Sequence, residues 1–570
     1  MANRSKPDRR REDRATSTEP RDERLILHRL GRAGKRRRRG DRGGDAVAPA
    51  HGRSHRKDQG KSPRRRRFQC DDQPGLDVSP TVFVTFWVLI ALVALGVRVH
   101  FLLSHPMRYD ESYNYLEIAS KSPFHAATHY LPNNHILHTL FVWASAAVFG
   151  NSPASLRLPA LLGGMLLLPA VAWLAWVVSG SRAAAALAAA AVAASSALIE
   201  YSANARGYSW LAVWATLAVA LTVVLTRRPD ARRLWLTWGV VGALGAYTVP
   251  VMAHAMAGLC AWFVWSAFRS GVSGVRGRSL VAGLGLGFAV FAGGTLLLYA
   301  PVLLWEGLSG FRRGAHMAYQ ILGAQVGSPA SMLMGAWSLW TRHTSWVVVA
   351  ALVLGIVCYA RSAIEDRAPE RFAPLVMLLF AMLLAVAMRA PLPPRAWLFA
   401  LPTVLGCASA GLWAAWPGDA GPFVYRSTRL VAAVLLLCLL LSPLITVCPQ
   451  PLLYSETGGI VEVEEVLDDC VRVGPRRCAV VSPYTPALRY YVGQKGMTTP
   501  SLPSDRAVER VYIVARDAAG LRQVWNDAVV GYASFGPPKL WRRLRESSVY
   551  LANRLTSTAQ NALDHPSDFR

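Results

Sequence analysis

The sequence predicts an all-α polytopic membrane protein with a small α/β domain at its C-terminal end. The chain has 570 residues, of which 52% are hydrophobic and 17% charged, with a formal net charge of +27. Its apolar residues form repeated, almost uncharged blocks of roughly 17 to 25 residues, the length that crosses a membrane as a helix. This composition excludes a string of soluble domains, a disulfide-rich secreted module and a fully disordered chain.

Residues 1–79 form a basic tail ahead of the first apolar block. They hold 24 Lys and Arg against 12 Asp and Glu, without apolar periodicity, so we expect a disordered segment. The tail and the apolar run after it are both too long for a signal peptide. A polybasic segment before a span suits the anionic cytoplasmic leaflet. Because interleaved aromatic residues are missing, we interpret the tail as a topology determinant and expect no nucleic-acid partner.

The predicted transmembrane domain covers residues 80–448. We expect eleven spans in it, at 80–103, 155–178, 183–199, 207–226, 234–249, 251–268, 280–304, 344–360, 372–389, 395–416 and 430–448. A further apolar stretch, 134–149, is short for a span and includes polar residues at its start, so it is predicted to be a re-entrant or interfacial helix.

The basic residues also predict the orientation of the spans. With the tail in the cytoplasm, the inner connections hold 13 Lys and Arg in 46 residues, and the outer ones hold 9 in 107. An excess of positive charge on the cytoplasmic side is the rule for membrane proteins. We therefore expect a multi-pass protein of the plasma membrane, surrounded by membrane lipids, with a cytoplasmic N-terminus and an extracytoplasmic C-terminus.

Residues 449–570 are expected to form a small extracytoplasmic α/β domain. Strand-like runs at 478–481 and 511–515 each precede a segment of helical composition, at 484–493 and 517–529. Cys448, Cys470 and Cys478 would lie in an oxidising compartment. A disulfide between Cys470 and Cys478 and one that uses Cys448 are both compatible with the sequence, because spacing alone does not settle the connectivity.

The first outer loop carries the strongest functional signal. Tyr109, Asp110 and Glu111 follow the first span, so two adjacent carboxylates lie at the membrane edge, where ionisable groups are costly and commonly functional. A carboxylate there could deprotonate an acceptor hydroxyl if its pKa lay near the working pH. The alternative is structural, with Asp110 capping a helix and Glu111 stabilising its first turn.

Further polar residues gather later in this loop. They are His125, His129, Asn133, Asn134, His135 and His138. Such side chains could bind a phosphate or a divalent metal, and His135 and His138 are spaced to share a helix face. The candidate metal ligands are Glu111, His135 and Glu200, and a divalent metal is the one cofactor that the pattern suggests. The rival interpretation is a set of hydrogen-bonded surface residues.

Three arginines lie at the outer ends of predicted spans: Arg157, Arg206 and Arg395. Guanidinium suits phosphate through its fork of N–H donors, whereas a single arginine at this depth commonly only reaches for the interface. Three of them on the side of the two acids favour a site for an anionic ligand.

Five short motifs follow one another along the transmembrane domain: Tyr109-Asp110-Glu111, Asn134-His135, Arg157-Leu158-Pro159, Ala205-Arg206-Gly207-Tyr208 and Pro394-Arg395. Their order and spacing resemble those of the type C glycosyltransferases, in the bacterial group of protein O-mannosyltransferases and lipid A aminoarabinose transferases. The resemblance covers roughly residues 80–448, outside the tail and the C-terminal domain.

The resemblance implies a polyprenyl-phosphate-linked sugar as donor, an acceptor glycan, protein or lipid on the outer face, and inversion at the anomeric carbon. It implies that Asp110 is the general base, with Glu111 beside it, while arginines stabilise the departing phosphate. The candidate residues for binding substrate or lipid phosphate are Tyr109, Asn134, His135, His138, Arg157, Arg206, Tyr208 and Arg395.

The chain departs from the family pattern at two places. His135-Ile136-Leu137 replaces the His-Pro-Pro of many relatives, and Ala205-Arg206-Gly207 stands where several have a second Asp. The second departure counts against a metal held by acids from both loops, and it makes Glu200 the alternative second acid.

Two other classes of protein share part of this pattern. A lipid or sugar transporter or flippase would use edge charges as a headgroup pathway, but the sequence has no internal repeat of the kind typical of transporters. A non-catalytic membrane scaffold would bind a partner through its outer domain and would leave the loop acids dispensable.

Overall fold

The computed structural model describes most of the membrane part and most of the C-terminal part of the chain. The described residues are 80–326, 328–389, 392–415, 438–439, 460–474, 477–482, 485–495, 508–525, 535–543 and 547–555. The predicted tail (1–79), Cys448 and nearly all of the span predicted at 430–448 lie outside these residues.

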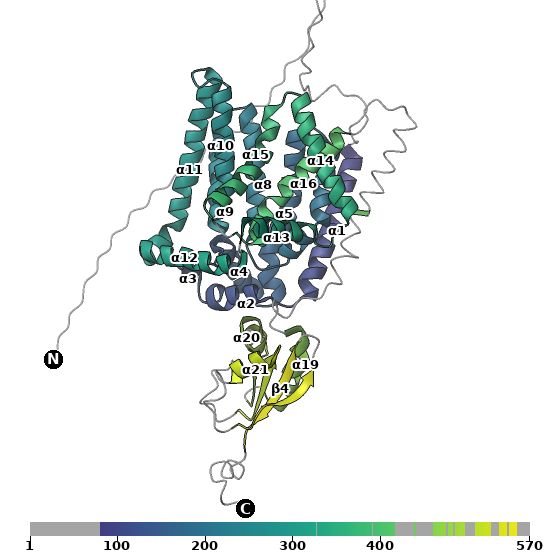
Figure 1. Ribbon diagram of the computed structural model, residues 1–570, viewed down its shortest axis with the longest axis vertical. Helices are drawn as coiled ribbons and strands as arrows, with labels where there is room; N and C mark the ends of the chain where they lie inside the picture. Colours follow the sequence, from purple (N-terminus) through teal and green to yellow (C-terminus); the bar gives the residue numbers. More distant parts are fainter. Residues whose placement is uncertain are drawn as a thin grey trace, which may run out of the picture. The chain divides into compact units, whose positions relative to one another are not determined.

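Long apolar helices run alongside one another in the membrane part (Figure 1). They are α1 (Pro80–Ser104), α5 (Pro153–Ser179), α8 (Tyr208–Arg227), α9 (Arg232–Thr248), α10 (Met252–Arg269), α11 (Val275–Trp305), α14 (Trp346–Glu365), α15 (Ala373–Ala387) and α16 (Leu401–Ala414). Each of them corresponds to one predicted span, because each is a nearly uncharged block of sequence.

Within the described residues, the helices that can cross a membrane do not reach the eleven predicted spans. Within the described residues, six helices are long and apolar enough to do so, or seven with one bent pair. Helices α9 and α16 have 17 and 14 residues, fewer than a span needs, and α10 includes His254 and Arg269. The protein is therefore a multi-pass membrane protein, but eleven spans are not confirmed.

The bent pair replaces the single span predicted at 183–199. Helix α6 (Arg182–Ala194) and helix α7 (Ser196–Ser202) meet at an angle of 67°. Such a break removes helical partners from backbone carbonyls inside the membrane, where water does not replace them. Arg98 of α1, which is 0% exposed, donates hydrogen bonds to the carbonyls of Val192 and Ala193 at 3.1 and 3.3 Å. The break therefore depends on a side chain far away in the sequence.

Further helices, most of them short, gather at one end of the long ones (Figure 1). They are α2 (Tyr109–Asn114), the π-helix η1 (Tyr115–Ala119), α3 (Pro123–Thr128), α4 (Ile136–Phe149), α12 (Gly307–Val326) and α13 (Pro329–Thr341), with the 3-10 helix η3 (Pro394–Phe399) nearby. Helix α4 falls in the stretch predicted to be re-entrant or interfacial, and its 14 residues are too few to cross a membrane. Helices α12 and α13 were not predicted.

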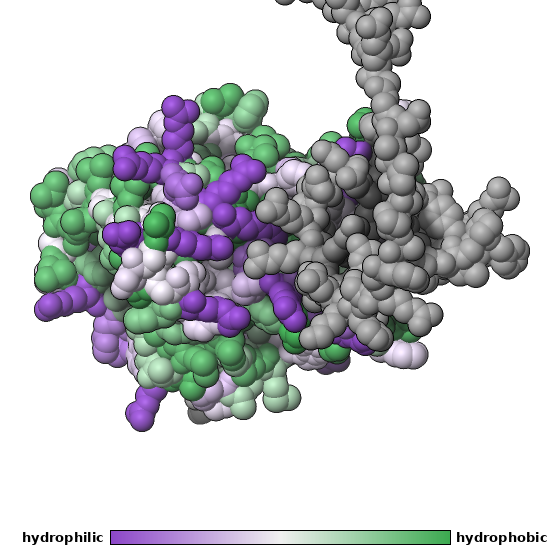
Figure 2. Space-filling model, turned by 90° about the horizontal axis from the view of Figure 1, so that it is seen from above, coloured by the Kyte–Doolittle hydropathy of each residue, from purple (hydrophilic) through white to green (hydrophobic). Residues whose placement is uncertain are grey.

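The opposite end of the long helices is basic. Figure 2 shows hydrophilic side chains gathered there among hydrophobic ones. The exposed arginines in and beside the α8–α9, α10–α11 and α14–α15 turns are Arg227, Arg228, Arg232, Arg233, Arg269, Arg276, Arg278, Arg361 and Arg367. These turns are the connections that the sequence analysis assigned to the cytoplasm.

The C-terminal part contains a four-stranded sheet in the order β1-β2-β4-β3. Its elements are α19 (Ile460–Val473), β1 (Cys478–Val481), α20 (Thr485–Gln494), β2 (Arg510–Ala515), α21 (Ala518–Val524), β3 (Lys539–Arg543) and β4 (Ser548–Asn553). Strands β1 and β2 are parallel, and β4 pairs antiparallel with both β2 and β3. The predicted strands and the helices after them are present. Of the two disulfides that the sequence left open, the structure forms Cys470–Cys478, which joins α19 to β1.

Candidate functional site

A cavity of about 220 Å³ opens among the segments at the end of the bundle that carries the short helices. It is lined by Arg108, Tyr109, Asp110, Glu200, Tyr201, Asn204, Arg206, Tyr208, Leu339, Arg342 and Arg395. These residues come from α2, α7, the loop before α8, α8 itself, α13 and η3, with Arg108 and Arg342 flanking α2 and α13. Four predicted binding residues, Tyr109, Arg206, Tyr208 and Arg395, and the predicted base Asp110 therefore share one cavity.

Helix α2 places Asp110 at the cavity wall. Arg108, not Asp110, is the N-cap residue, and its backbone N–H donates to Oε2 of Glu111 at 2.8 Å. The Glu111 carboxylate therefore closes the first turn, as acids early in a helix commonly do. Asp110 is left with its side chain 29% exposed and facing the arginines of the cavity.

The Asp110 carboxylate lies between two guanidinium groups. Its Oδ2 atom is 3.4 Å from Nη1 of Arg206 and 3.4 Å from Nη1 of Arg395. Burial by itself would raise the pKa of Asp110, but the charges of Arg206, Arg395 and Arg108 outweigh burial and lower the pKa below its ordinary value. Asp110 is therefore ionised at neutral pH and able to accept a proton.

The two arginines beside Asp110 are fixed by different contacts. Nε of Arg395 donates to the Tyr208 hydroxyl at 3.1 Å, and Nη2 of Arg206 donates to Oδ1 of Asn133 at 3.3 Å. The Arg206 guanidinium also lies 5.9 Å from the centre of the Tyr208 ring. Nε of Arg206 is buried and has no hydrogen-bond partner among the described residues. Arg206 therefore keeps a spare donor next to the cavity.

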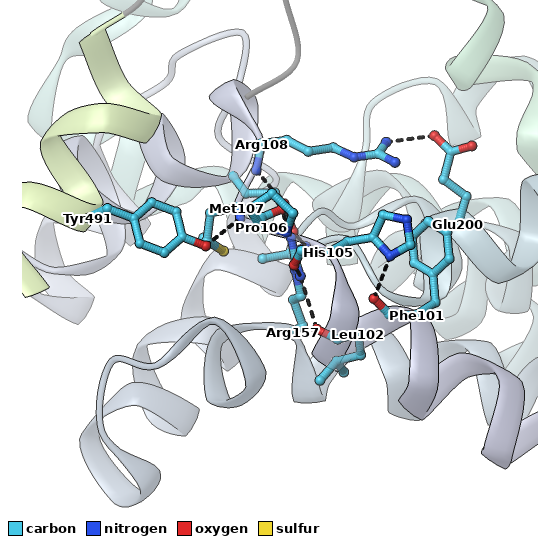
Figure 3. A network of polar contacts seen from close by, with 11 residues as sticks. Phe101, Leu102, His105, Pro106, Met107, Arg108, Arg157, Glu200 and Tyr491 are labelled. Atoms are coloured by element: carbon cyan, nitrogen blue, oxygen red, sulfur yellow. Dashed lines mark hydrogen bonds and ion pairs between the residues drawn. The ribbon is translucent and has the colours of Figure 1, made fainter. Parts of the chain in front are cut away.

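Glu200 is a second acid in the same cavity, and it also pairs with two arginines. Its Oε1 atom accepts from Nη1 of Arg108 at 2.6 Å (Figure 3), and its Oε2 atom is 3.8 Å from Nη1 of Arg342. The sequence analysis named Glu200 but neither arginine. Arg108 could have been found, since it precedes Tyr109 directly; Arg342 has no such signal, because the fold of α13 brings it there.

Glu111 and Arg157 form a buried ion pair behind the cavity. Arg157 donates from Nε and Nη2 to the two carboxylate oxygens of Glu111, at 2.8 and 2.6 Å. Its remaining N–H groups bind the carbonyls of Leu102, His105 and Pro106 at 2.7–3.1 Å. Burial would raise the pKa of Glu111, but the charge and hydrogen bonds of Arg157 lower it overall.

This ion pair places two predicted site residues outside the cavity. Glu111 was assigned to catalysis and Arg157 to phosphate binding, but neither is among the described residues that line the cavity. Every N–H donor of Arg157 is already bonded to protein. Both side chains instead hold the segment before α2 in place, since breaking a buried ion pair is strongly destabilising.

Three other predicted binding residues lie outside the cavity, and one of them, His135, supports the loop that carries Arg206. Nδ1 of His135 accepts the Gly207 N–H at 2.9 Å, and burial, followed by the charge of Arg206, lowers the pKa of His135 well below its ordinary value. Asn134 donates to two backbone carbonyls within its own loop. His138 is buried, and neither of its ring nitrogens has a partner among the described residues. None of the three is among the described residues that line the cavity.

The predicted metal ligands do not come together. Glu111 binds Arg157, His135 binds the Gly207 N–H, and Glu200 binds Arg108. Across the described part of the chain, no group of three or more His, Cys, Asp and Glu side chains is close enough to hold an ion.

Comparison with known proteins identifies the fold. No protein-family model and no curated protein sequence matches the chain. Among solved structures, ArnT from Cupriavidus metallidurans bound to undecaprenyl phosphate is similar with a TM-score of 0.57 and 15% identity, over 84% of this chain and 99% of that one. The oligosaccharyltransferase AglB from Archaeoglobus fulgidus, in complex with an inhibitory peptide and a dolichol-phosphate, has a TM-score of 0.45 and 13% identity, over 82% of this chain and 74% of that one. ArnT is a type C glycosyltransferase, so the resemblance found in the sequence is confirmed at the level of the fold.

Proposed function

We propose that the protein is a membrane glycosyltransferase that moves a sugar from a polyprenyl-phosphate-linked donor to an acceptor hydroxyl. The observation that carries the proposal is the Asp110 carboxylate held between Arg206 and Arg395 in the cavity. The ArnT structure of the same fold is bound to a polyprenyl phosphate. A base beside phosphate-binding groups is what this transfer needs.

The charge of the cavity suits a lipid phosphate. Four arginines line it, and only two carboxylates, Asp110 and Glu200, oppose them. Guanidinium groups bind phosphate oxygens through paired N–H donors, and Arg206 retains a donor without a protein partner among the described residues. The excess positive charge stabilises the phosphate as it gains negative charge on leaving the sugar.

The proposed reaction is a single displacement. Asp110 accepts the proton of the acceptor hydroxyl while the acceptor oxygen forms a bond to the anomeric carbon. The bond between that carbon and the phosphate oxygen breaks, and the polyprenyl phosphate leaves with the bonding electrons. Attack opposite the leaving group inverts the anomeric configuration. Phosphate bound to Arg206 and Arg395 also offsets the charges that lower the pKa of Asp110, which makes Asp110 a stronger base.

The proposed acceptor lies on the extracytoplasmic face of the plasma membrane. The cavity is lined by residues of α2 and α13, which lie at the end of the long helices (Figure 1) opposite the turns that carry the exposed arginines. Basic connections favour the cytoplasmic side, so the cavity belongs on the outer side. The acceptor is a glycan, a protein or a lipid.

The test is sugar transfer by the purified protein in proteoliposomes. Donors are polyprenyl-phosphate-linked sugars labelled in the sugar, supplied with cell-envelope acceptors. We expect Asp110→Asn to lower the transfer rate roughly a hundredfold or more, because the base is lost. The matched control, Glu365→Gln, changes an exposed acid at the far end of α14 and should transfer at the wild-type rate. Full activity of Asp110→Asn would remove Asp110 as the base, and an inactive wild type with every donor would remove the function.

A further inference from the structure

The segment between α1 and α2 carries Arg108 and leads directly into Asp110. Its backbone carbonyls at His105 and Pro106 accept hydrogen bonds from Arg157. Its N–H groups are also bonded: His105 donates to Phe101, and Arg108 donates to Glu111. The position of this segment sets the position of the proposed base, so each of these bonds bears on catalysis.

The remaining N–H group of this segment is bound from the C-terminal domain. Met107 donates its backbone N–H to the Tyr491 hydroxyl at 2.8 Å, with Tyr491 reaching across from α20 (Figure 3). Pro106 has no N–H to donate. Arg157 from α5 thus holds the carbonyls of the segment, and Tyr491 from α20 holds its one other amide.

Helix α20 also packs against the segment that leads into Arg206, another residue that lines the cavity. Tyr490 is 2% exposed and belongs to a cluster of buried residues that includes Met107, Leu156 and Ala205. Met107 precedes Arg108, and Ala205 precedes Arg206. The Tyr490 hydroxyl and the Gln494 amide donate to the Asn151 carbonyl, which fixes α20 against the same end of the bundle.

The opposite contacts of α20 tie it to the core of its own domain. Leu488 and Val492, four residues apart on the helix, are buried with Val480 of β1. The same cluster contains both cysteines of the disulfide, Cys470 and Cys478. Helix α20 is therefore held by a cross-linked domain core and is able to act as a rigid support.

We propose that α20 is a positioning element of the active site and that Tyr491 is a positioning residue for Arg108 and Asp110. The inference rests on the proposed function, since it assigns the C-terminal domain to the catalysis of that reaction. Without the Tyr491 hydroxyl the Met107 amide loses its acceptor, and an unpaired amide in this setting favours other conformations of the segment. Fewer molecules then present Asp110 correctly to the acceptor.

The test is Tyr491→Phe in the full-length protein, which removes one hydroxyl and keeps the ring. We expect kcat to fall about fivefold, the order of effect of one lost hydrogen bond. The donor KM should change much less, because Arg206 and Arg395 lie on other segments. Hydrogen–deuterium exchange of the amides in 105–112 should become faster, while exchange in β1 and β2 stays unchanged.

The matched control is Tyr512→Phe, which removes another tyrosine hydroxyl of the same domain, one bonded to Asp469. It should leave kcat and the exchange of 105–112 as in the wild type. An active Tyr491→Phe variant with wild-type kcat and wild-type exchange would overturn the positioning role. If the wild type transfers no sugar, the proposed function fails. Hydrogen–deuterium exchange still tests the α20 contact in that case, and exchange of 105–112 in Tyr491→Phe at the same rate as in the wild type would overturn it.

Discussion

At the scale of single residues, the cavity is organised by two acids that are each held by two arginines. Asp110 lies between Arg206 and Arg395, and Glu200 between Arg108 and Arg342. In each set the positive charge exceeds the negative charge, so the acids position the arginines without neutralising the site. A bound phosphate competes with Asp110 for the same N–H donors, which couples donor binding to the strength of the base.

This coupling predicts the effect of Arg395→Gln on the pH profile. The pKa of Asp110 is below its ordinary value, so activity that needs the ionised carboxylate is present above that pKa and is lost as the pH falls through it. Removing the Arg395 charge raises the pKa, and the acidic limb of kcat/KM should move to higher pH. Loss of a phosphate contact should also lower kcat/KM roughly tenfold to a hundredfold at the optimum.

The measurement is kcat/KM for the donor as a function of pH. The matched control is Arg361→Gln, an exposed arginine at the far end of α14. Its profile should overlay that of the wild type. An unmoved acidic limb in Arg395→Gln would show that Asp110 is not the group that titrates.

Single residues also show how much of the candidate site the sequence predicts. The motifs brought Asp110, Arg206, Tyr208 and Arg395 to one side of the membrane, and the fold places them around one cavity. The sequence could not distinguish Glu111 from Asp110, or Arg157 from Arg206 and Arg395. Adjacent acids have the same pattern in a sequence, as do interfacial arginines, and only their burial separates them. Only the fold distinguishes the partly exposed acid of α2, Asp110, from the buried one, Glu111.

At the scale of elements, the break between α6 and α7 brings Glu200 into the cavity. Hydropathy predicts one span there, since both helices are apolar, and Ser195 and Ser196 are the only local sign of a break. The partner that stabilises the break, Arg98, lies in α1. A contact between residues so distant in sequence has no periodic signature, so the sequence does not predict it.

Arg98→Met tests this account of the break. The change leaves the carbonyls of Val192 and Ala193 and the hydroxyl of Ser202 without the guanidinium. We expect a loss of about 2 to 4 kcal/mol in stability, because buried carbonyls lose their donors. Transfer should also fall, since α7 carries Glu200. Thermal unfolding in detergent measures the first effect, with Arg361→Met as the exposed control; an unchanged midpoint for Arg98→Met would contradict it.

At the scale of the whole molecule, the two ends of the long helices carry different features. One end carries the exposed arginines of the turns, and the other carries the cavity together with the contacts to α20. The net charge of +27 is therefore mostly unrelated to the substrate. Composition predicted the positions of the long apolar helices, because these depend on local sequence, but it did not predict α12, α13 or the break between α6 and α7. The docking of α20 depends on a tyrosine that is 384 residues from its partner.

Cysteine labelling in intact cells tests which end of the helices faces the outside. Ser273 lies in the exposed turn between α10 and α11 at the basic end, and Lys539 is exposed on β3 of the C-terminal domain. Because basic connections stay in the cytoplasm, a membrane-impermeant maleimide should label Lys539→Cys in intact cells but Ser273→Cys only after lysis. The parent protein supplies the background from its native cysteines. If Ser273→Cys were labelled in intact cells and Lys539→Cys were protected, the orientation would be the opposite of the proposed one. The cavity would then face the cytoplasm, and the acceptor would be a cytoplasmic molecule.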